Sequence, residues 1–248
     1  MLIDFCLPIK NEAAILRGNL DKLLSYCHRF DAIFTWRIIG IINGSQDDSA
    51  AIFQEFKDRF PKIVDYLVIA EAGRGRALKK YWGEGAADIL VYMDADLAVS
   101  LDNIPALINP LLRDESDLVI GSRFLKGAKV QRSLNRELIS RAYSFISRCL
   151  LNHSIADSQC GFKAIRREVF HKLKPFLRDN YWFFDTELIL LAKYFGYRIK
   201  EIPVDWQENR YGQHKSTVKI IADSWQFLKN IMIFRRRLKE LKKHSGNV

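Results

Sequence analysis

The chain has 248 residues, of which 48% are hydrophobic and 27% charged, and its formal net charge is +10. This composition excludes a disordered chain, and the length allows one core that buries roughly three quarters of the surface exposed by the unfolded chain. The positive charge predicts an anionic partner, such as a nucleotide, a phospholipid headgroup or a nucleic acid, without choosing among them.

The first half of the chain alternates strand-like and helical segments. Five short apolar runs rich in β-branched residues predict buried parallel strands, and they begin at Leu2, Arg37, Lys62, Asp88 and Asp117. Between the first two runs, apolar residues recur at helical spacing over 16–27, which predicts a crossover helix. This alternation predicts a doubly wound α/β sheet that binds ligands at the carboxyl ends of its strands.

After residue 135 the pattern becomes mainly helical. Helices are expected over 136–151, 166–173 and 185–195, and a strand over 199–206, in which Pro203 indicates an edge strand or a short one. From Ser216 onward we expect a basic amphipathic helix with Trp225 and Phe234 on its apolar side. Two interpretations of this helix stay open: it lies in a membrane interface, or it packs on the domain or on a second subunit.

Cysteine usage and the N-terminus indicate a compartment. The four cysteines, Cys6, Cys27, Cys149 and Cys160, have neither the spacing of a zinc site nor the density of a disulfide scaffold, so core thiols in a reducing cytoplasm are expected. No secretory signal pattern is present, and no run approaches the roughly 18 apolar residues of a spanning helix. We therefore expect a cytoplasmic protein that meets any membrane from its cytoplasmic surface.

Two carboxylates follow the fourth predicted strand. Asp94 and Asp96 emerge at its carboxyl end, where oxygen ligands can hold a hard divalent cation, Mg²⁺ or Mn²⁺, against a diphosphate. Acidic residues also cap helices and fill loops, so a pair alone is weak evidence. Its position at the end of an α/β strand makes this pair a candidate metal site.

The segment Asp94-Ala95-Asp96 resembles the DxD motif of family 2 inverting glycosyltransferases. Other segments occur in the order typical of that family: LPIKNEA, INGSQDDS, RGRALKKYW, GSRF, DSQCGFKAIRREV and ENRYGQHKS. The later segments resemble the branch that transfers mannose or glucose to dolichyl phosphate or a similar polyprenyl phosphate. The resemblance implies the GT-A fold, a Rossmann-like, mostly parallel sheet, with a catalytic domain over 1–213 and a C-terminal amphipathic helix over 214–248.

The resemblance also implies roles for single residues. Asp94 would face the nucleotide ribose or diphosphate, and Asp96 would be the principal metal ligand. The nucleotide site would further include Pro8, Asn11, Glu12, Asn43, Ser45, Arg74, Arg76 and Lys79. The basic members of this set stand near a predicted helix N-terminus, which favours an anion, although a solvated basic turn would look similar. Asn11 and Glu12 also fit a plain helix entry.

The phosphate-binding positions of the family fall later in the chain. Arg123, and Arg136 with Ser140 one helical turn on, correspond to residues that hold the acceptor phosphate and the donor diphosphate. Lys215 corresponds to a lysine in a late turn that can close over the donor. Arginine suits phosphate because its planar fork binds two oxygens and stays charged. Three acidic residues either order these arginines or form caps and ion pairs: Asp157, Asp185 and Glu187. Gln159 is a further polar candidate.

Three positions depart from the family pattern. Ile42 stands where the family has an aspartate that helps to read the nucleotide base, which leaves Asn43 as the polar residue of that turn. Ala98 replaces a metal-contacting glutamine of the mannosyl branch, so that DADLAV is more similar to the glucosyl branch. His214 replaces a serine beside Lys215.

Three functions stay open. The first is inverting transfer of hexose from a UDP- or GDP-sugar to a polyprenyl phosphate, which is ionised at neutral pH and needs no strong base. The second is transfer to a hydroxyl, for which Asp157 or Asp185 would be the base. The third is a non-catalytic scaffold that binds a partner or a membrane. Nucleic acid is not expected as a partner, because the usual reader motifs are absent.

Overall fold

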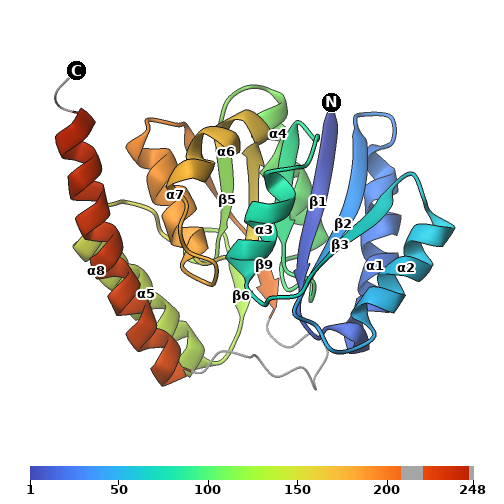
Figure 1. Cartoon of the computed structure of the whole chain (residues 1–248), viewed down its shortest axis with the longest axis horizontal. Coiled ribbons are helices and arrows are strands. Elements are labelled where there is room, and N and C mark those ends of the chain that lie inside the picture. The colour runs from blue at the N-terminus through green and yellow to red at the C-terminus, as the bar shows by residue number, and fades with distance from the viewer. Residues whose placement is uncertain (208–219, 246–248) are drawn as a thin grey trace.

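The computed structural model describes residues 1–207 and 220–245, without the side chains of 135–136, 220–225 and 244–245. Its main sheet has seven strands in the order β3-β2-β1-β4-β7-β5-β8 (Figure 1). These strands are β1 (Leu2–Ile9), β2 (Thr35–Asn43), β3 (Val64–Ile69), β4 (Ile89–Met93), β5 (Leu118–Ser122), β7 (Phe162–Arg166) and β8 (Ile199–Pro203). A two-stranded sheet pairs β6 (Lys129–Gln131) with β9 (Asp205–Gln207).

The helices cover both faces of the main sheet (Figure 1). They are α1 (Ala13–Cys27), α2 (Ser49–Arg59), α3 (Arg74–Trp82), α4 (Ile104–Leu112), α5 (Leu134–Leu151), α6 (Arg167–Leu173), α7 (Phe184–Tyr194) and α8 (Ile220–Ser245). The helices predicted from the sequence are confirmed, with ends within two residues of the expected ones in α5, α6 and α7. The predicted α/β class with a C-terminal helix is confirmed as well.

One central strand was not predicted. β1 to β4 pair in parallel as expected, but β7 lies antiparallel between β4 and β5, so these two strands are not neighbours. The sequence conceals β7 because Lys163, a residue that rarely lies in a core, occupies its middle. β8 lies at the edge of the sheet, as Pro203 predicted. The single strand expected over 199–206 is wrong, because β8 ends at Pro203 and residues 205–207 form β9 of the small sheet.

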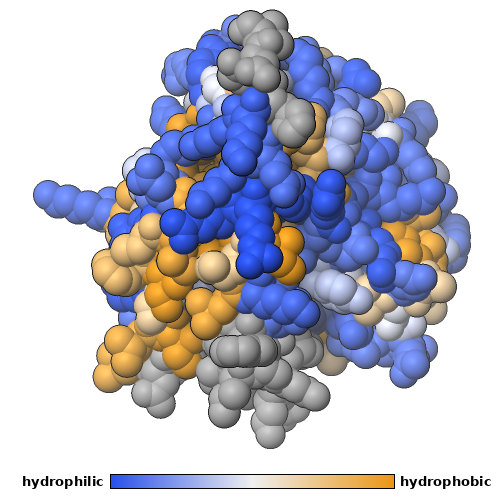
Figure 2. Space-filling view, turned by 60° about the vertical axis from the view of Figure 1, so that its left-hand side comes forward, coloured by the Kyte–Doolittle hydropathy of each residue, from blue (hydrophilic) through white to orange (hydrophobic). Residues whose placement is uncertain are grey.

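The C-terminal helix α8 packs on the domain along one side and is exposed along the other. It lies beside α5, and its Ile231 and Phe234 are buried. Met232 and Ile233 remain about half exposed. Figure 2 shows this side of the molecule, with hydrophobic side chains gathered below hydrophilic ones. Among the helices described, none combines the length and the apolar content that crossing a bilayer requires, and the predicted boundary between 213 and 214 lies outside the described residues.

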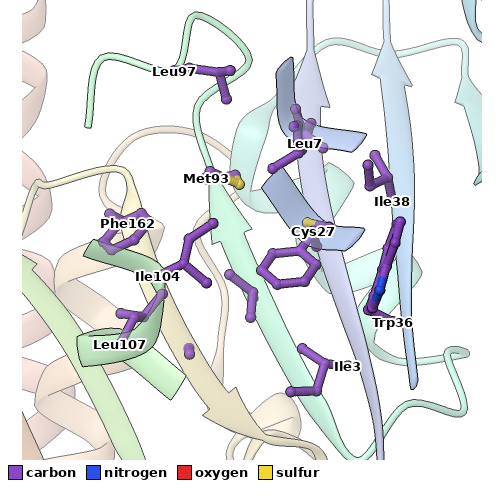
Figure 3. Packing of buried hydrophobic residues seen from close by; sticks show 14 of the residues in the cluster. Ile3, Leu7, Cys27, Trp36, Ile38, Met93, Leu97, Ile104, Leu107 and Phe162 are labelled. Atoms are coloured by element: carbon purple, nitrogen blue, oxygen red, sulfur yellow. The ribbon is translucent and has the colours of Figure 1, made fainter. Parts of the chain in front are cut away.

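Two hydrophobic clusters hold the layers together. One packs α1, α2 and α4 against the sheet, with Ile3 and Leu7 of β1 facing Cys27 of α1 and Ile38 of β2 (Figure 3). The other joins α3, α6 and α7 to the opposite face and includes the buried residues of α8. Because the sheet is apolar on both faces, its central strands are fixed in place.

The cysteines are free thiols, and three of the four are in the core. Cys6, Cys27 and Cys160 are buried, as expected. The expectation of a core thiol is wrong for Cys149, which is exposed because it lies on the outer side of α5.

The strand order of the main sheet reverses between β1 and β4. Doubly wound sheets bind ligands at such a point. The carboxyl ends of β1, β2 and β4 lie at the lower edge of the molecule in Figure 1. Asp94 and Asp96 follow β4 at this edge, and Asn11 and Asn43 lie at the ends of β1 and β2. These four predicted site residues therefore lie at the edge where ligand binding is expected.

Candidate active site

Asp94 lies at the end of β4, against the residue that precedes β7. Its amide N–H donates a hydrogen bond to the carbonyl oxygen of Gly161, 3.2 Å away. A Cβ atom on Gly161 would lie 1.9 Å from Asp94 Oδ2. The side chain of Asp94 is 43% exposed. The carboxylate therefore occupies space that a glycine leaves open, and it still reaches solvent.

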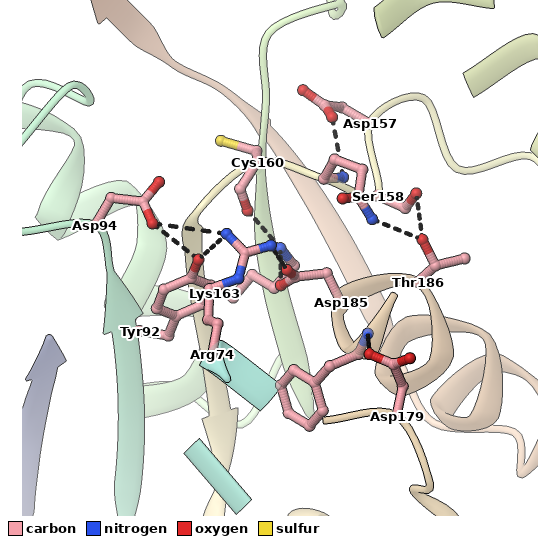
Figure 4. A network of polar contacts seen from close by, with 12 residues as sticks. Arg74, Tyr92, Asp94, Asp157, Ser158, Cys160, Lys163, Asp179, Asp185 and Thr186 are labelled. Atoms are coloured by element: carbon pink, nitrogen blue, oxygen red, sulfur yellow. Dashed lines mark hydrogen bonds and ion pairs between the residues drawn. The ribbon is translucent and has the colours of Figure 1, made fainter. Parts of the chain in front are cut away.

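A network of charged and polar groups contacts Asp94 from the interior of the domain (Figure 4). The Tyr92 hydroxyl donates to Asp94 Oδ1 at 2.9 Å, and Arg74 Nη1 lies 3.7 Å from the same oxygen. Arg74 also binds the carboxylate of Asp185, whose Oδ1 lies 2.7 Å from Lys163 Nζ. Asp185 and Lys163 are buried. Two cations and two carboxylates thus balance one another beneath the site.

Loss of water on the inner side of the partly exposed Asp94 carboxylate raises its pKa, although the Arg74 charge and the Tyr92 hydrogen bond oppose this effect. The ionised carboxylate is therefore stabilised only in part by the protein. A divalent cation beside it would favour the ionised form further, since opposite charge lowers a carboxyl pKa.

Asp96 is separated from Asp94 by one buried residue, Ala95. Asn19 Nδ2 donates to the Ala95 carbonyl oxygen at 2.9 Å, and Ala95 is buried. Asp96 Oδ1 accepts a hydrogen bond from the Ala98 N–H at 3.0 Å, which shapes the turn. Within the described residues, no cluster of three or more His, Cys, Asp or Glu side chains is suited to a metal. Two carboxylates fit a hard cation that takes its other ligands from phosphate and water.

The turns after β1 and β2 bind each other. Asn11, at φ +56°, receives a bond from the Gln46 N–H through its Oδ1, and its own N–H donates to Ser45 Oγ at 3.1 Å. Asn43 is buried, and its Oδ1 accepts the N–H of Gly73 at 2.9 Å just before α3. These hydrogen bonds fix the turns after β1 and β2 and the start of α3 beside the site.

The structure shows where Ile42, the residue that replaces the family's base-reading aspartate, lies. Ile42 is 2% exposed and packs in the cluster beneath α1 and α2. It therefore takes no part in reading a base. The adjoining Glu12 N–H and Ala13 N–H bind Ser49 Oγ and Asp47 Oδ2, so side chains after β2 cap the start of α1.

The basic residues of α3 point to different partners. Arg74 reaches Asp94, as described, while Arg76 forms an ion pair with Glu71 at 2.8 Å. Lys79 Nζ lies 3.3 Å from the carbonyl oxygen of Arg178, on the side that faces the 177–179 segment. Pro8 lies in β1 beside Ile41 of β2. Of the three predicted cations, the structure brings Arg74 to the Asp94 carboxylate.

Arg123 follows β5 and binds Asp157 through two parallel hydrogen bonds. The distances are 2.7 Å from Nε to Oδ2 and 2.9 Å from Nη2 to Oδ1. Asp157 is fully buried. Burial alone would raise the pKa of Asp157, but the charge and hydrogen bonds of Arg123 outweigh it, and the pKa is lowered. Such a carboxylate is a poor proton acceptor.

Ser140 accepts a hydrogen bond from Arg132 Nη2 at 2.7 Å. The side chain of Arg136 and the residues His214 and Lys215 lie outside the described residues, so their predicted roles stay predictions. Gln159 Nε2 donates to Thr186 Oγ1 at 2.9 Å. Glu187 is buried and accepts the N–H groups of 178 and 179.

The model of Glycosyl transferase family 2 matches residues 4–174. The chain belongs to glycosyl transferase family 2. It is 32% identical to Glycosyltransferase AglD of Haloferax volcanii over 205 residues, which are 83% of this chain and 33% of that protein.

Other family 2 relatives are dolichyl-phosphate beta-glucosyltransferases. ALG5C of Trichomonas vaginalis is 29% identical, over 82% of this chain and 63% of its own length, and the human enzyme is 28% identical, over 83% and 67%. The chain thus spans between a third and two thirds of these relatives. Glucosyl-3-phosphoglycerate synthase of Mycobacterium tuberculosis, solved with UDP, superposes with a TM-score of 0.68 at 19% identity, covering 94% of this chain and 80% of that one. This likeness confirms the predicted GT-A fold.

Several site residues were not predicted from the sequence. Tyr92, Gly161 and Lys163 support Asp94, but they come from two strands whose pairing the sequence does not reveal. A signal was present in one case, because Lys163 stands between Phe162 and Ala164 in a strand-length apolar segment. A cation in such a place needs a buried carboxylate as its partner.

Proposed function

We propose that this family 2 chain transfers a hexose, glucose or mannose, from a UDP- or GDP-sugar to a polyprenyl phosphate with inversion. The proposal rests on the burial and pairing of Asp157 and Asp185, the two candidates for the base that a hydroxyl acceptor would need. Asp157 and Asp185 are both fully buried, and each is bound by an arginine. A phosphate acceptor needs no base, because it is already ionised.

The donor side of the proposal rests on the DxD carboxylates. Asp94 and Asp96 would hold Mg²⁺ or Mn²⁺, which when bound supplies positive charge to the diphosphate leaving group. The Mycobacterium tuberculosis synthase has also been solved with Mn²⁺, UDP and phosphoglyceric acid, which supports a metal and a nucleotide as ligands of this fold. Arg74 and Tyr92 orient Asp94.

The acceptor side rests on cations. Arg123 retains N–H donors that Asp157 does not use, since a guanidinium has five. We propose that these donors, with Ser140, Arg136 and Lys215, gather the acceptor phosphate and the leaving diphosphate. Charge placed where the leaving group develops stabilises the transition state. The names of the dolichyl-phosphate relatives agree with such an acceptor.

A membrane surface is the proposed place of action. We call the exposed apolar residues of two neighbouring helices the α5–α8 apolar face: Leu134, Leu138, Phe145, Leu228 and Met232. Leu134, Leu138 and Phe145 recur at helical spacing and are 86%, 70% and 61% exposed. Exposed apolar surface of this kind marks an interaction site. A lipid-linked acceptor would supply an apolar chain that contacts the α5–α8 apolar face and a phosphate that binds in the site.

The charges around this face fit an anionic bilayer on its cytoplasmic side. The outer part of α8 exposes Arg235, Arg236, Lys239, Lys242 and Lys243. Figure 2 shows hydrophilic side chains beside the hydrophobic ones on this side. Basic residues beside an inserted apolar face attract acidic lipid headgroups. The first turns of α5 and α8 lie toward the edge where the strands end (Figure 1).

The test is a panel of UDP- and GDP-hexoses with Mn²⁺, with and without a short polyprenyl phosphate. Release of nucleotide that depends on the lipid phosphate supports the proposal and identifies the base. Turnover only with soluble hydroxyl acceptors would overturn the proposal that the acceptor is a lipid phosphate. Absence of nucleotide binding would overturn the proposal that the chain is a glycosyltransferase. Asp96→Ala should lose about 100-fold or more of the metal-dependent rate; a near-normal rate would show that the metal site is elsewhere.

A further inference from the structure

The short segment from Asp157 to Gly161 connects the two sides of the candidate site. At its start, Asp157 binds Arg123, the proposed ligand of the acceptor phosphate. At its end, Gly161 accepts the amide N–H of Asp94 and leaves space for that carboxylate. In Figure 4 the segment leads from Asp94 on the left to Asp157 on the right. Its middle residue is Gln159.

Transfer with inversion places the hexose between these two sides. An acceptor phosphate oxygen forms a bond to the anomeric carbon while the bond from this carbon to the diphosphate oxygen breaks, and the leaving diphosphate takes the electron pair. The diphosphate is proposed to lie at Asp94 and Asp96, and the acceptor phosphate at Arg123. A hexose ring held between them lies beside Gln159, which is half-buried.

The core of the domain holds the amide nitrogen of Gln159. Its Nε2 donates to Oγ1 of Thr186, a buried residue in the first turn of α7, at 2.9 Å. The same oxygen lies 3.0 Å from the Tyr143 hydroxyl and 3.1 Å from the Ser158 hydroxyl. A hydroxyl has one proton and two lone pairs, so these three contacts occupy it fully. A hydrogen-bonded network inside the domain therefore fixes how the Gln159 amide is oriented.

The amide oxygen of Gln159 is the group that a ligand can use. Within residues 1–207 and 220–245, none donates a hydrogen bond to its Oε1. A carbonyl oxygen accepts O–H and N–H groups, and an ionised phosphate offers it no proton. The hexose carries hydroxyl groups. The ribose does as well, but the proposed nucleotide site is at the ends of β1 and β2, on the other side of Asp94 from β7.

We propose that Gln159 binds a hydroxyl group of the donor hexose through Oε1 and that Thr186 is a positioning residue that orients the amide. The inference rests on the proposed function and deepens it by assigning a residue that selects the sugar. A site that binds a substrate hydroxyl rejects the analogue without it far more strongly than an apolar pocket rejects an analogue that differs by one methylene. Gln159 therefore contributes to the choice between hexoses that differ at one hydroxyl.

The test compares binding of nucleotide sugars with binding of the nucleotides alone. Calorimetry in Mn²⁺ measures UDP-glucose and GDP-mannose against UDP and GDP for the wild type, Gln159→Met, Thr186→Val and Thr186→Ser. Gln159→Met keeps the length of the side chain, and Thr186→Ser keeps the hydroxyl. The matched control is Gln54→Met, which removes an exposed amide that binds Asp58 and Tyr66 beside α2.

Gln159→Met and Thr186→Val should weaken binding of the nucleotide sugar that the wild type prefers by about five- to tenfold, the effect of one lost hydrogen bond. Affinity for UDP or GDP should change by less than about twofold, and Thr186→Ser and Gln54→Met should bind like the wild type. Monodeoxy analogues of the preferred sugar complete a double-mutant cycle. The analogue that lacks the contacted hydroxyl should bind more weakly to the wild type and lose nothing further in Gln159→Met.

The inference is overturned if nucleotide and nucleotide sugar weaken equally, if neither weakens, or if the losses from every deoxy analogue add to that of Gln159→Met. A variant that raises only KM for the polyprenyl phosphate also overturns it, because Gln159 then contacts the acceptor. Each of these results leaves the proposed function standing when the wild type transfers the hexose. The melting temperature of each variant checks that it is folded.

Failure of the proposed function gives a different result. If the wild type binds a nucleotide sugar and transfers the hexose to no polyprenyl phosphate, the proposed acceptor is wrong, and the binding data still decide the role of Gln159. If the wild type binds no nucleotide sugar, the proposed function and the inference fail together.

Discussion

At the scale of single residues, the position of Asp94 depends on a neighbour without a side chain and on two neighbours that contact its carboxylate. Gly161 leaves space for the carboxylate, and Tyr92 and Arg74 hold one of its oxygens. Asp185 and Lys163 then compensate Arg74 in the core. Removing one member of such a buried set leaves an uncompensated charge, which is strongly destabilising. Substitutions that keep the charge balance are therefore the better tests of the site.

Gly161→Ala keeps every charge and changes one atom. The added Cβ would lie 1.9 Å from Asp94 Oδ2, so the carboxylate has to move. We expect metal-dependent transfer to fall by about 100-fold, since misplacement by about 1 Å has this effect. The control is Gly18→Ala in α1, where nothing lies within 4 Å of the new atom. It should keep full activity; equal activity of both variants would contradict the placement of Asp94.

His153, after the end of α5, makes stability depend on pH. Burial lowers its pKa to about 4, with a smaller effect from the Lys193 and Arg148 charges. The folded state therefore binds this proton less readily than the unfolded state, whose pKa is about 6.5. The contribution of the neutral imidazole is complete above pH 6.5 and is lost as the pH falls toward 4.

Urea unfolding at pH 7 and pH 4.5 measures this effect. Relative to His153→Gln, the wild type should lose about 1–2 kcal/mol of unfolding free energy between the two pH values, which is less than the full pKa difference implies because the ring is partly exposed. Parallel pH profiles of wild type and variant would show that His153 titrates normally.

At the scale of elements, α8 joins the domain through a few buried side chains. Phe234 is 1% exposed, and its ring centroid lies 5.8 Å from that of Phe183 in an edge-to-face arrangement. Arg237 forms an ion pair with the buried Glu187 one turn later. The membrane and packing interpretations of this helix are therefore compatible, because they use different sides of it.

Phe234→Ala should detach α8 without unfolding the sheet. Loss of a buried phenylalanine costs about 3–5 kcal/mol, and this cost falls on the contact between α8 and α7. Hydrogen exchange should rise in 226–243 and stay low in β1 and β4. Met232→Ala, at a position that is 44% exposed, is the matched control and should leave exchange unchanged. Uniform loss of protection across the chain would contradict local detachment.

At the scale of the whole molecule, the first turns of α5 and α8 lie toward the carboxyl edge of the sheet. From there the two helices run side by side, and α8 continues through its basic residues to the C-terminus at the top of Figure 1. The net charge of +10 adds a long-range attraction to anionic surfaces that salt screens.

Binding to vesicles tests this arrangement. The double variant Leu138→Ser/Phe145→Ser should bind vesicles of acidic phospholipid about tenfold more weakly, because apolar insertion is lost. Its control is Ile33→Ser/Val68→Ser, which removes two residues that are 68% and 57% exposed elsewhere on the surface. Binding should also decrease with rising salt. If the first pair changes the oligomeric state and leaves vesicle binding intact, the face joins two copies of the chain.

The sequence determined much of this protein by itself. Alternating apolar runs predicted the α/β layers because burial on both faces demands them. The position of Asp94 and Asp96 at a strand end, with their resemblance to the DxD motif, predicts a metal site there. The tertiary structure alone decided the insertion of β7, the support of Asp94 by Gly161 and Lys163, and the hydrogen bond between Gln159 and Thr186. These contacts join residues far apart in the chain, and local periodicity carries no record of which strands become neighbours.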